Sequence, residues 1–220
     1  MARVSAKDRS RQFIEAAARV IAAEGVAAAT TRRIAAEADA PLAALHYCFR
    51  SKEDLINEVY NYLSRDYARE LEPMDENLDM SQTVRRHMNW IWHRMLAHPH
   101  EQVTTFELLL RSTRMDSEEE IGVARETNRN MYQAWITSTS TIFRAAAQRG
   151  TQATGVDYEL VARMAIAGID GISLQHLSDP DERRSALLVE ALCQSIEQLL
   201  GKAAPAAVPM PATSTGTEAG

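Results

Sequence analysis

The sequence predicts an all-α protein, and three observations lead to that prediction. Hydrophobic residues make up 45% of the 220 residues, but Phe, Trp and Tyr together make up only 6%. Many Ala, Leu and Ile with few aromatics favour helices. Apolar residues recur at helical spacing, and no run of alternating β-branched residues is long enough for a strand. The nine glycines and seven prolines are sparse and cluster near the ends of the helical segments.

The first expected helix begins behind Ser5 and ends at Gly25. Ser5 and Asp8 have the spacing of a capping box, with Asp in place of Glu. Gly25 is a typical C-terminal stop. Between these limits one apolar face is formed by Phe13, Ile14, Ala17, Ala18, Ile21 and Ala22.

Residues 30–49, TTRRIAAEADAPLAALHYCF, predict two short helices joined by a tight turn. Thr30 or Thr31 can cap the first helix. Pro41 can open the second, because a proline at the first helical position gives up no hydrogen bond. Asp39 tolerates the left-handed conformation that the exit from the first helix needs. The pattern is that of a helix-turn-helix, whose second helix is free to enter a major groove.

Longer helices are expected in the rest of the chain. Ser51 caps the fourth, with Glu53 and Asp54 favourably placed in its first turn, and Pro73 ends it. The others are expected at about 81–97, 100–113, 117–149, 157–178 and 181–201, separated by Pro99, by Gly150 with Gly155, and by Asp179-Pro180.

Charge is distributed unevenly along the chain, whose formal net charge is −6. Residues 1–52 carry nine Lys and Arg against five Asp and Glu, while the remainder carries 15 basic against 25 acidic residues. The excess of positive charge indicates that only the N-terminal unit approaches a polyanion, although uneven solvating charge gives the same counts. We expect a small unit at 1–52, a helical body at 53–202 and a disordered tail at 203–220.

The compartment is inferred from the cysteines and from missing apolar segments. Cys48 and Cys193 are too few for a disulfide framework and fit a reducing cytosol. The polar start MARVSAKDRS lacks the features of a signal peptide. No stretch approaches the ~18 apolar residues of a membrane span. The sequence therefore predicts a soluble, cytoplasmic protein without membrane contact.

From Gly25 to Leu55 the sequence resembles the TetR-type (TetR/AcrR) family of bacterial transcriptional repressors. The resemblance rests on Gly25, Thr30-Thr31-Arg32, Ile34-Ala35, Ala38, Leu45, Tyr47, Phe49, and Ser51-Lys52-Glu53 with Leu55. It covers roughly the first 65 residues by motif, and the remainder only by helix count. The turn departs from the family, because Asp39 stands where Gly is usual and Pro41 where a polar cap is usual.

The resemblance implies an N-terminal three-helix helix-turn-helix DNA-binding domain and a C-terminal helical ligand-binding and dimerisation domain. It implies a ligand-responsive repressor that binds a palindromic operator in double-stranded DNA as a homodimer. A small, hydrophobic or aromatic effector would release it. The last two helices would form the dimer interface through Val161, Met164, Ala165, Gly168 and Ile172 and through Leu187, Leu188, Ala191, Leu192, Ile196 and Leu199, although part of each stripe must pack within its own chain.

The resemblance also implies which residues contact DNA: Thr30, Thr31, Arg32, Leu42, Ala43, Ala44, His46, Tyr47 and Lys52. Family members often carry hydrogen-bonding side chains where Leu42 and the two alanines after it stand. Base readout is therefore expected to use thymine methyls, Arg32, and His46 or Tyr47. Capping by the two threonines is compatible with DNA contact, and His46 is as readily a solvated histidine.

The effector is expected in an apolar cavity that has a few hydrogen-bonding groups. Its expected lining is Met88, Trp92, Phe106, Leu110, Asn128, Met131, Tyr132 and Trp135. For any one of these residues, a place in the plain core is the alternative.

Three alternatives differ from this interpretation. Catalysis or metal binding is not expected, because His87 and His93 do not share a helix face and no catalytic or cofactor motif occurs. No cofactor is therefore expected. A thiol-based redox sensor using Cys48 or Cys193 stays open, as does a helical adaptor that binds no DNA.

Overall fold

The computed structural model describes residues 5–70, 77–149 and 155–201, without the side chains of residues 64–70. Within these residues every regular element is a helix, which confirms the all-α expectation. The elements are α1 Ala6–Ala28, α2 Thr31–Glu37, α3 Leu42–Cys48, α4 Lys52–Glu70, α5 Met80–Ala97, α6 Pro99–Arg111, the 3-10 turn η1 Ser112–Arg114, α7 Glu118–Arg149, α8 Tyr158–Ser178 and α9 Glu182–Leu200. Pro73, Gly150 and the tail at 203–220 lie outside the described residues.

The predicted local stops and caps explain where the first helices begin and end. The Ser5 hydroxyl accepts a hydrogen bond from the Asp8 amide at 3.1 Å, and the Ser51 hydroxyl accepts one from the Asp54 amide at 3.0 Å. Gly25 has φ 80°, so the helical path of α1 breaks there. Asp39 has φ 47°, the left-handed conformation expected of the turn between α2 and α3.

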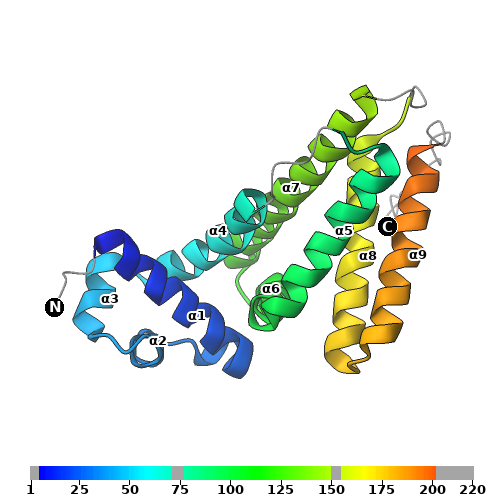
Figure 1. Cartoon of the computed structure of the whole chain (residues 1–220). Helices are drawn as coiled ribbons and strands as arrows, with labels where there is room; N and C mark the ends of the chain where they lie inside the picture. Colours follow the sequence, from blue (N-terminus) through cyan, green and yellow to red (C-terminus); the bar gives the residue numbers. More distant parts are fainter. Residues whose placement is uncertain (1–4, 71–76, 150–154, 202–220) are drawn as a thin grey trace, which may run out of the picture.

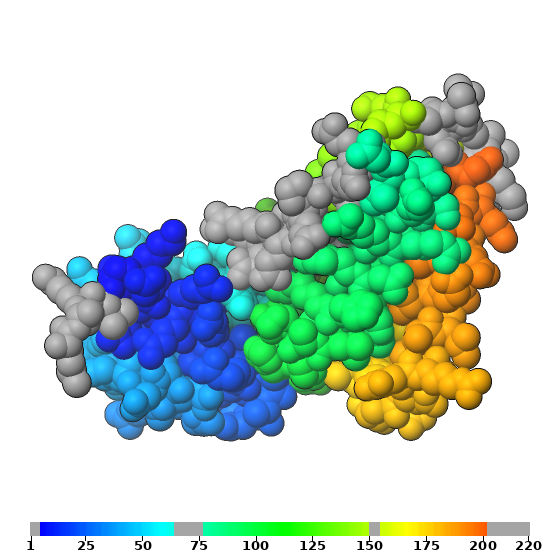
Figure 2. Space-filling view, viewed as in Figure 1, coloured from blue at the N-terminus to red at the C-terminus, as the bar shows by residue number. Residues whose placement is uncertain are grey.

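Helices α1, α2 and α3 form a small head at one end of the molecule, and α4 leads from it to the body (Figure 1). In the body α5, α7, α8 and α9 pack against one another. Helix α6 lies between the two parts and packs against α1. The space-filling view shows the head as a separate lobe that meets the green surface of the body (Figure 2).

The apolar core of the head continues beyond residue 52. Phe13, Ile34 and Leu45 are fully buried in the head, and the same cluster includes Leu108 of α6 and Met131 of α7. A second cluster fills the body between α5, α7, α8 and α9. The head shares its core with α6 and α7. A shift of either helix would therefore change the packing of the head.

Candidate functional site

The helix-turn-helix presents a short second helix whose outer face is open. The Thr30 hydroxyl caps α2 by accepting a hydrogen bond from the Arg33 amide at 3.2 Å. Leu45 is fully buried and anchors α3 to the head. On the opposite side of α3, Ala43, His46 and Tyr47 are exposed, and Tyr47 has 85% of its surface accessible. A large aromatic side chain held this far out can reach a partner without any rearrangement of the head.

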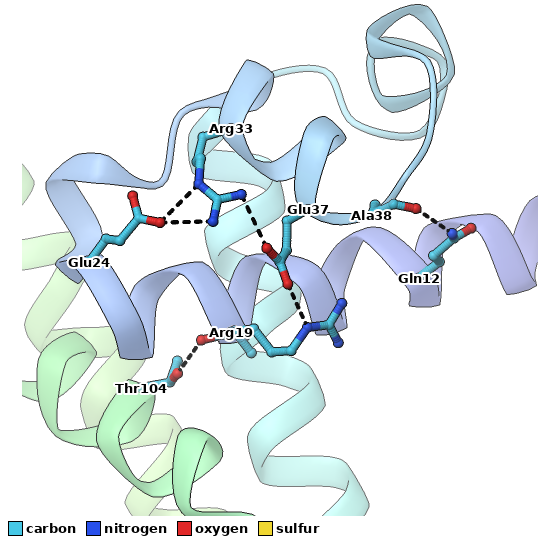
Figure 3. Close-up of polar contacts among 8 residues, drawn as sticks. Gln12, Arg19, Glu24, Arg33, Glu37, Ala38 and Thr104 are labelled. Carbon is cyan, nitrogen blue, oxygen red and sulfur yellow. Dashed lines mark hydrogen bonds and ion pairs between the residues drawn. The ribbon is translucent and has the colours of Figure 1, made fainter.

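A polar network holds α2 against α1 (Figure 3). Arg33 forms ion pairs with Glu24 at 2.8 Å and Glu37 at 3.1 Å, and Arg19 pairs with Glu37 at 3.0 Å. Hydrogen bonds from Arg19 and from Arg33 lower the pKa of Glu37. The Gln12 amide donates to the carbonyl of Ala38 at 2.6 Å. The sequence analysis missed this network, although Arg33 and Glu37 have the spacing of a helical ion pair.

The expected DNA-contacting residues fall into two groups by exposure. Five are exposed: Thr30, Arg32, Ala43, His46 and Tyr47. Thr31, Leu42 and Ala44 are half-buried, and the last two pack on the core of the head. Arg32 projects into solvent, in contrast to its neighbour Arg33.

Lys52 is placed differently from the other expected contacts. Its ammonium group donates to the carbonyl of Val26 at 3.1 Å, at the end of α1. Partial burial, with a smaller contribution from the charge of Arg111, lowers its pKa. Lys52 therefore joins the start of α4 to α1, and only part of its donor capacity points outward.

The body contains a cavity of about 50 Å³ between α5, α6, α7 and α8, closed at one side by Leu63 of α4. This volume holds a few water molecules at most. Its lining is Leu63, Ile91, Arg94, Met95, His98, Glu101, Gln102, Thr105, Trp135, Ile166, Ile169 and Asp170. A site that is mostly apolar with a few polar groups is the usual form of a small-molecule site.

Two of the cavity's charged groups neutralise each other. Arg94 of α5 and Glu101 of α6 form an ion pair at 2.8 Å, with 15% and 6% of their side-chain surfaces exposed. The hydroxyl of Tyr62 donates to the other oxygen of Glu101 at 2.9 Å. These contacts join α4, α5 and α6 at the cavity wall.

Asp170 of α8 has a different environment. The hydroxyl of Tyr132 donates to its carboxylate at 3.0 Å. Burial raises the pKa of Asp170 to about 6, partly offset by this hydrogen bond. At neutral pH the group is therefore charged but poorly solvated.

The structure brings few of the expected ligand-binding residues to this cavity. Trp135 lines it, and Tyr132 lies beside it through the contact with Asp170. Trp92 lines a neighbouring outer groove, together with Met95 and Gln102. The polar lining was missed, although Asp170 stands alone in an otherwise apolar stretch of its helix.

The other expected ligand-binding residues lie away from the cavity lining. Met88 is fully buried in the body core, and Met131 is buried in the core shared with the head. The Asn128 amide donates to the carbonyl of Leu109 at 3.0 Å. Phe106 is half-buried and Leu110 is exposed. Apolar spacing alone could not separate these core and surface positions from the lining.

Helix α6 connects the cavity with the head. One side of α6 supplies Glu101, Gln102 and Thr105 to the cavity. From the side facing the head, the hydroxyl of Thr104 donates to the carbonyl of Ala18 at 2.7 Å (Figure 3). A displacement of α6 by cavity contents would therefore act on α1 directly.

The remaining chemical candidates are few. No set of three or more His, Cys, Asp or Glu that could hold a metal occurs among the residues described. None of the described helices is long and apolar enough to cross a membrane. Cys193 is buried, which raises the pKa of its thiol to about 11 and suppresses the reactive thiolate. Cys48 is half-buried against the core of the head.

Comparisons with known proteins agree with this arrangement. Residues 13–59 match the model of the tetR family of bacterial regulatory proteins, and residues 117–201 match that of the BetI-type transcriptional repressor C-terminal domain. The chain is 31% identical over 200 residues to the HTH-type nicotine-responsive transcriptional repressor HdnoR of Paenarthrobacter nicotinovorans, covering 90% of this chain and 99% of that relative.

Solved structures share the fold at low sequence identity. Salmonella enterica GusR superposes with a TM-score of 0.69 at 19% identity, covering 87% of this chain and 95% of that one. The transcriptional regulator FadR of Bacillus subtilis, in complex with stearoyl-CoA, gives 0.63 at 19% identity, covering 86% and 97%. With the family matches at both ends and the full-length relative, the chain belongs to the TetR family and is a ligand-responsive transcriptional repressor.

Proposed function

We propose that this repressor binds a palindromic operator as a homodimer through α8 and α9, and that a small aromatic effector in the α5–α8 cavity releases it. TetR-family regulators bind operator DNA, dimerise and bind small-molecule effectors, and they are not enzymes. The finer assignment is supported chiefly by the position of α6, which lines the cavity and packs against the head.

The proposed dimer surface consists of exposed apolar residues on the last two helices. Leu160, Met164 and Leu174 of α8 are 44%, 47% and 53% exposed, and Leu187 of α9 is 63% exposed. Spacings of four and ten residues put the three α8 side chains on one helix face. Exposed apolar side chains that share one face mark an interaction surface more often than scattered ones do.

Other residues of the expected dimer stripes pack inside the chain. Val161, Ala165, Ile172 and Ile196 are buried in the body core. At Gly168 an added Cβ would lie 2.5 Å from a methyl carbon of Leu192, so α8 and α9 approach closely there. These residues fix how α8 packs against α9 within one chain, and so they position the exposed residues of the proposed interface.

In the proposed complex α3 of each head lies in a major groove. Two heads about 34 Å apart match successive major grooves on one face of the duplex. Ala43 offers a methyl group to the methyl of thymine. Tyr47 and Arg32 contact base edges in the same major groove. Leu42 and Ala44 support α3 from its half-buried side, while Thr30, Thr31, His46 and Lys52 lie at the margin.

The effector would change the spacing of the heads. A molecule larger than the 50 Å³ cavity must push its walls apart, and α6 is the wall that contacts α1. Binding would favour a body in which α6, α1 and α4 are shifted and the heads no longer match the operator. The relative's response to nicotine supports an effector of small, aromatic type for this chain as well.

Operator binding is tested by gel shift on the DNA that flanks the protein's own gene. Arg32→Ala should weaken binding by about 1–3 kcal/mol, while Arg149→Ala at the far end of α7 removes the same charge without effect. Equal affinity of both variants would remove Arg32 from the interface.

Dimerisation is tested by light scattering at micromolar concentration. Met164→Glu combined with Leu187→Glu should give monomers that lose operator binding, since two charges would be buried without partners. A double variant that stays dimeric would place the interface elsewhere.

A further inference from the structure

The charges that the described residues bring to the effector cavity do not balance. Arg94 and Glu101 pair with each other at 2.8 Å and so cancel. Among the described residues, Asp170 receives a side-chain hydrogen bond only from the neutral hydroxyl of Tyr132. Within residues 5–63, 77–149 and 155–201, no basic side chain forms an ion pair with Asp170. The titratable groups around it at the cavity are Arg94, His98, Glu101 and Tyr132.

A partly buried carboxylate with one neutral donor still has acceptor capacity to fill. Each ionised carboxylate offers about four lone-pair positions, and Tyr132 occupies one of them. A cationic donor is the strongest partner for such a group, because a charge-assisted hydrogen bond is shorter and stronger than a neutral one. The cavity face of Asp170 therefore favours a ligand nitrogen that carries a positive charge.

Gln102 provides a second and independent observation. Its side chain lines the cavity and is only 8% exposed. Its amide nitrogen has no hydrogen-bond acceptor among the residues that the structure describes. Buried donors normally have partners, so this amide calls for an acceptor atom on the ligand.

The remaining wall suits a flat ring. Trp135 lines the cavity and meets Tyr132 edge-on, with ring centroids 5.4 Å apart and planes at 82°. Ile91, Ile166 and Ile169 provide apolar surface beside it. An aromatic ring can pack on these groups, and the Trp135 ring also attracts a nearby cation.

We propose that the effector is an organic monocation, with a protonated amine bound by Asp170, an aromatic ring packed against Trp135, and an acceptor atom bound by the Gln102 amide. This inference rests on the proposed function, because it assumes that the cavity is the effector site. It adds the charge class of the effector and assigns two recognition residues. Carboxylate and phosphate groups are disfavoured beside Asp170, since they carry the same charge as its carboxylate.

Binding requires the cavity to widen, and Met95 marks the place where it can. Met95 and Gln102 line both the cavity and an outer groove bounded by Trp92, Pro99 and His176. A Met side chain has three rotatable bonds and repacks readily. Rotation of Met95 would join the two spaces, and Gln102 would face the ligand from the junction.

The test compares amines with neutral compounds of the same shape. Suitable pairs are nicotine with its neutral lactam cotinine and 3-(aminomethyl)pyridine with 3-pyridinemethanol, measured by isothermal titration on the full-length protein. For pairs that bind, the amine should bind at least about tenfold tighter than its neutral partner. The tightest amine should also release operator in the gel shift.

Three variants separate charge recognition from loss of structure. Asp170→Asn keeps the acceptor for Tyr132 and should weaken amine binding by about 30-fold or more. Tyr132→Phe removes the neutral donor but keeps the carboxylate and the ring, so amines should still bind more tightly than their neutral partners. Glu118→Gln removes an exposed acidic charge from α7 and should bind as the natural protein does. Circular dichroism checks that each variant is folded.

The outcomes distinguish the two levels of the proposal. If neutral compounds bind and release operator as well as amines do, or if Asp170→Asn binds amines normally, the monocation inference is wrong and the cavity assignment stands. If no compound of either charge binds or releases operator, both the cavity assignment and the inference fail.

Discussion

Removal of one partner of the ion pair at the cavity wall should be strongly destabilising, and Glu101→Gln tests this expectation. Glu101 and Arg94 are 6% and 15% exposed at 2.8 Å, so both charges are largely desolvated. Removing one partner of a buried pair costs about 3–5 kcal/mol, because the other charge loses its nearest counter-charge while it stays buried. Gln still offers an oxygen to Tyr62, so we expect the lower end, about 3 kcal/mol.

Urea denaturation at one fixed protein concentration measures this loss, since the unfolding of a dimer depends on concentration. The matched control is Glu159→Gln, which breaks the Arg163–Glu159 pair at 2.8 Å, where the side chains are 48% and 52% exposed. That exposed helical pair should contribute only about 0.3–0.5 kcal/mol. Equal losses in both variants, or a loss below about 1 kcal/mol for Glu101→Gln, would refute the reasoning and mean that Arg94 regains water.

Three further predictions concern the turn, the contact between α6 and α1, and pH. Asp39→Gly should raise the free energy of unfolding by about 0.5 kcal/mol, because φ 47° suits glycine; thermal melts that show no gain would contradict this. Thr104→Val removes the hydroxyl that donates to the Ala18 carbonyl, so it should cost about 1 kcal/mol and raise the effector concentration needed for operator release; an unchanged release curve would argue against transmission through α6. Amine binding needs ionised Asp170, whose pKa is raised to about 6. The dissociation constant of the amine should therefore rise about fourfold as pH falls from about 7.5 to 5.5, because the ionised fraction of Asp170 falls by that factor. Asp170→Asn should abolish this pH dependence.

The helix limits could be predicted because their causes are local. Ser5 and Ser51 cap their helices through residues three positions ahead. Gly25 and Asp39 have positive φ, where the sequence predicts a stop and a left-handed exit. Each of these features depends on a few neighbouring residues, so one sequence contains enough information to place it.

The cavity could not be predicted, because its lining depends on how helices rotate about their axes in the packed body. Met88 and Trp135 lie on equally apolar helices, yet only Trp135 faces the cavity. The sequence alone places Glu101 on the surface. In the structure it is buried, because Arg94 at the end of α5 forms an ion pair with it at 2.8 Å. Lys52 stays an expected phosphate contact, but its hydrogen bond to the Val26 carbonyl could not be predicted from the sequence.

The network around Arg33 affects how strongly operator binding depends on salt concentration. Arg33 and Arg19 are among the nine basic residues of the first 52, and each forms an ion pair with a glutamate within the head. Cations engaged in this way displace few counterions from the duplex, so the logarithm of the binding constant should fall with salt less steeply than the count of basic residues suggests. The head thus favours fit to the groove over general attraction to any DNA.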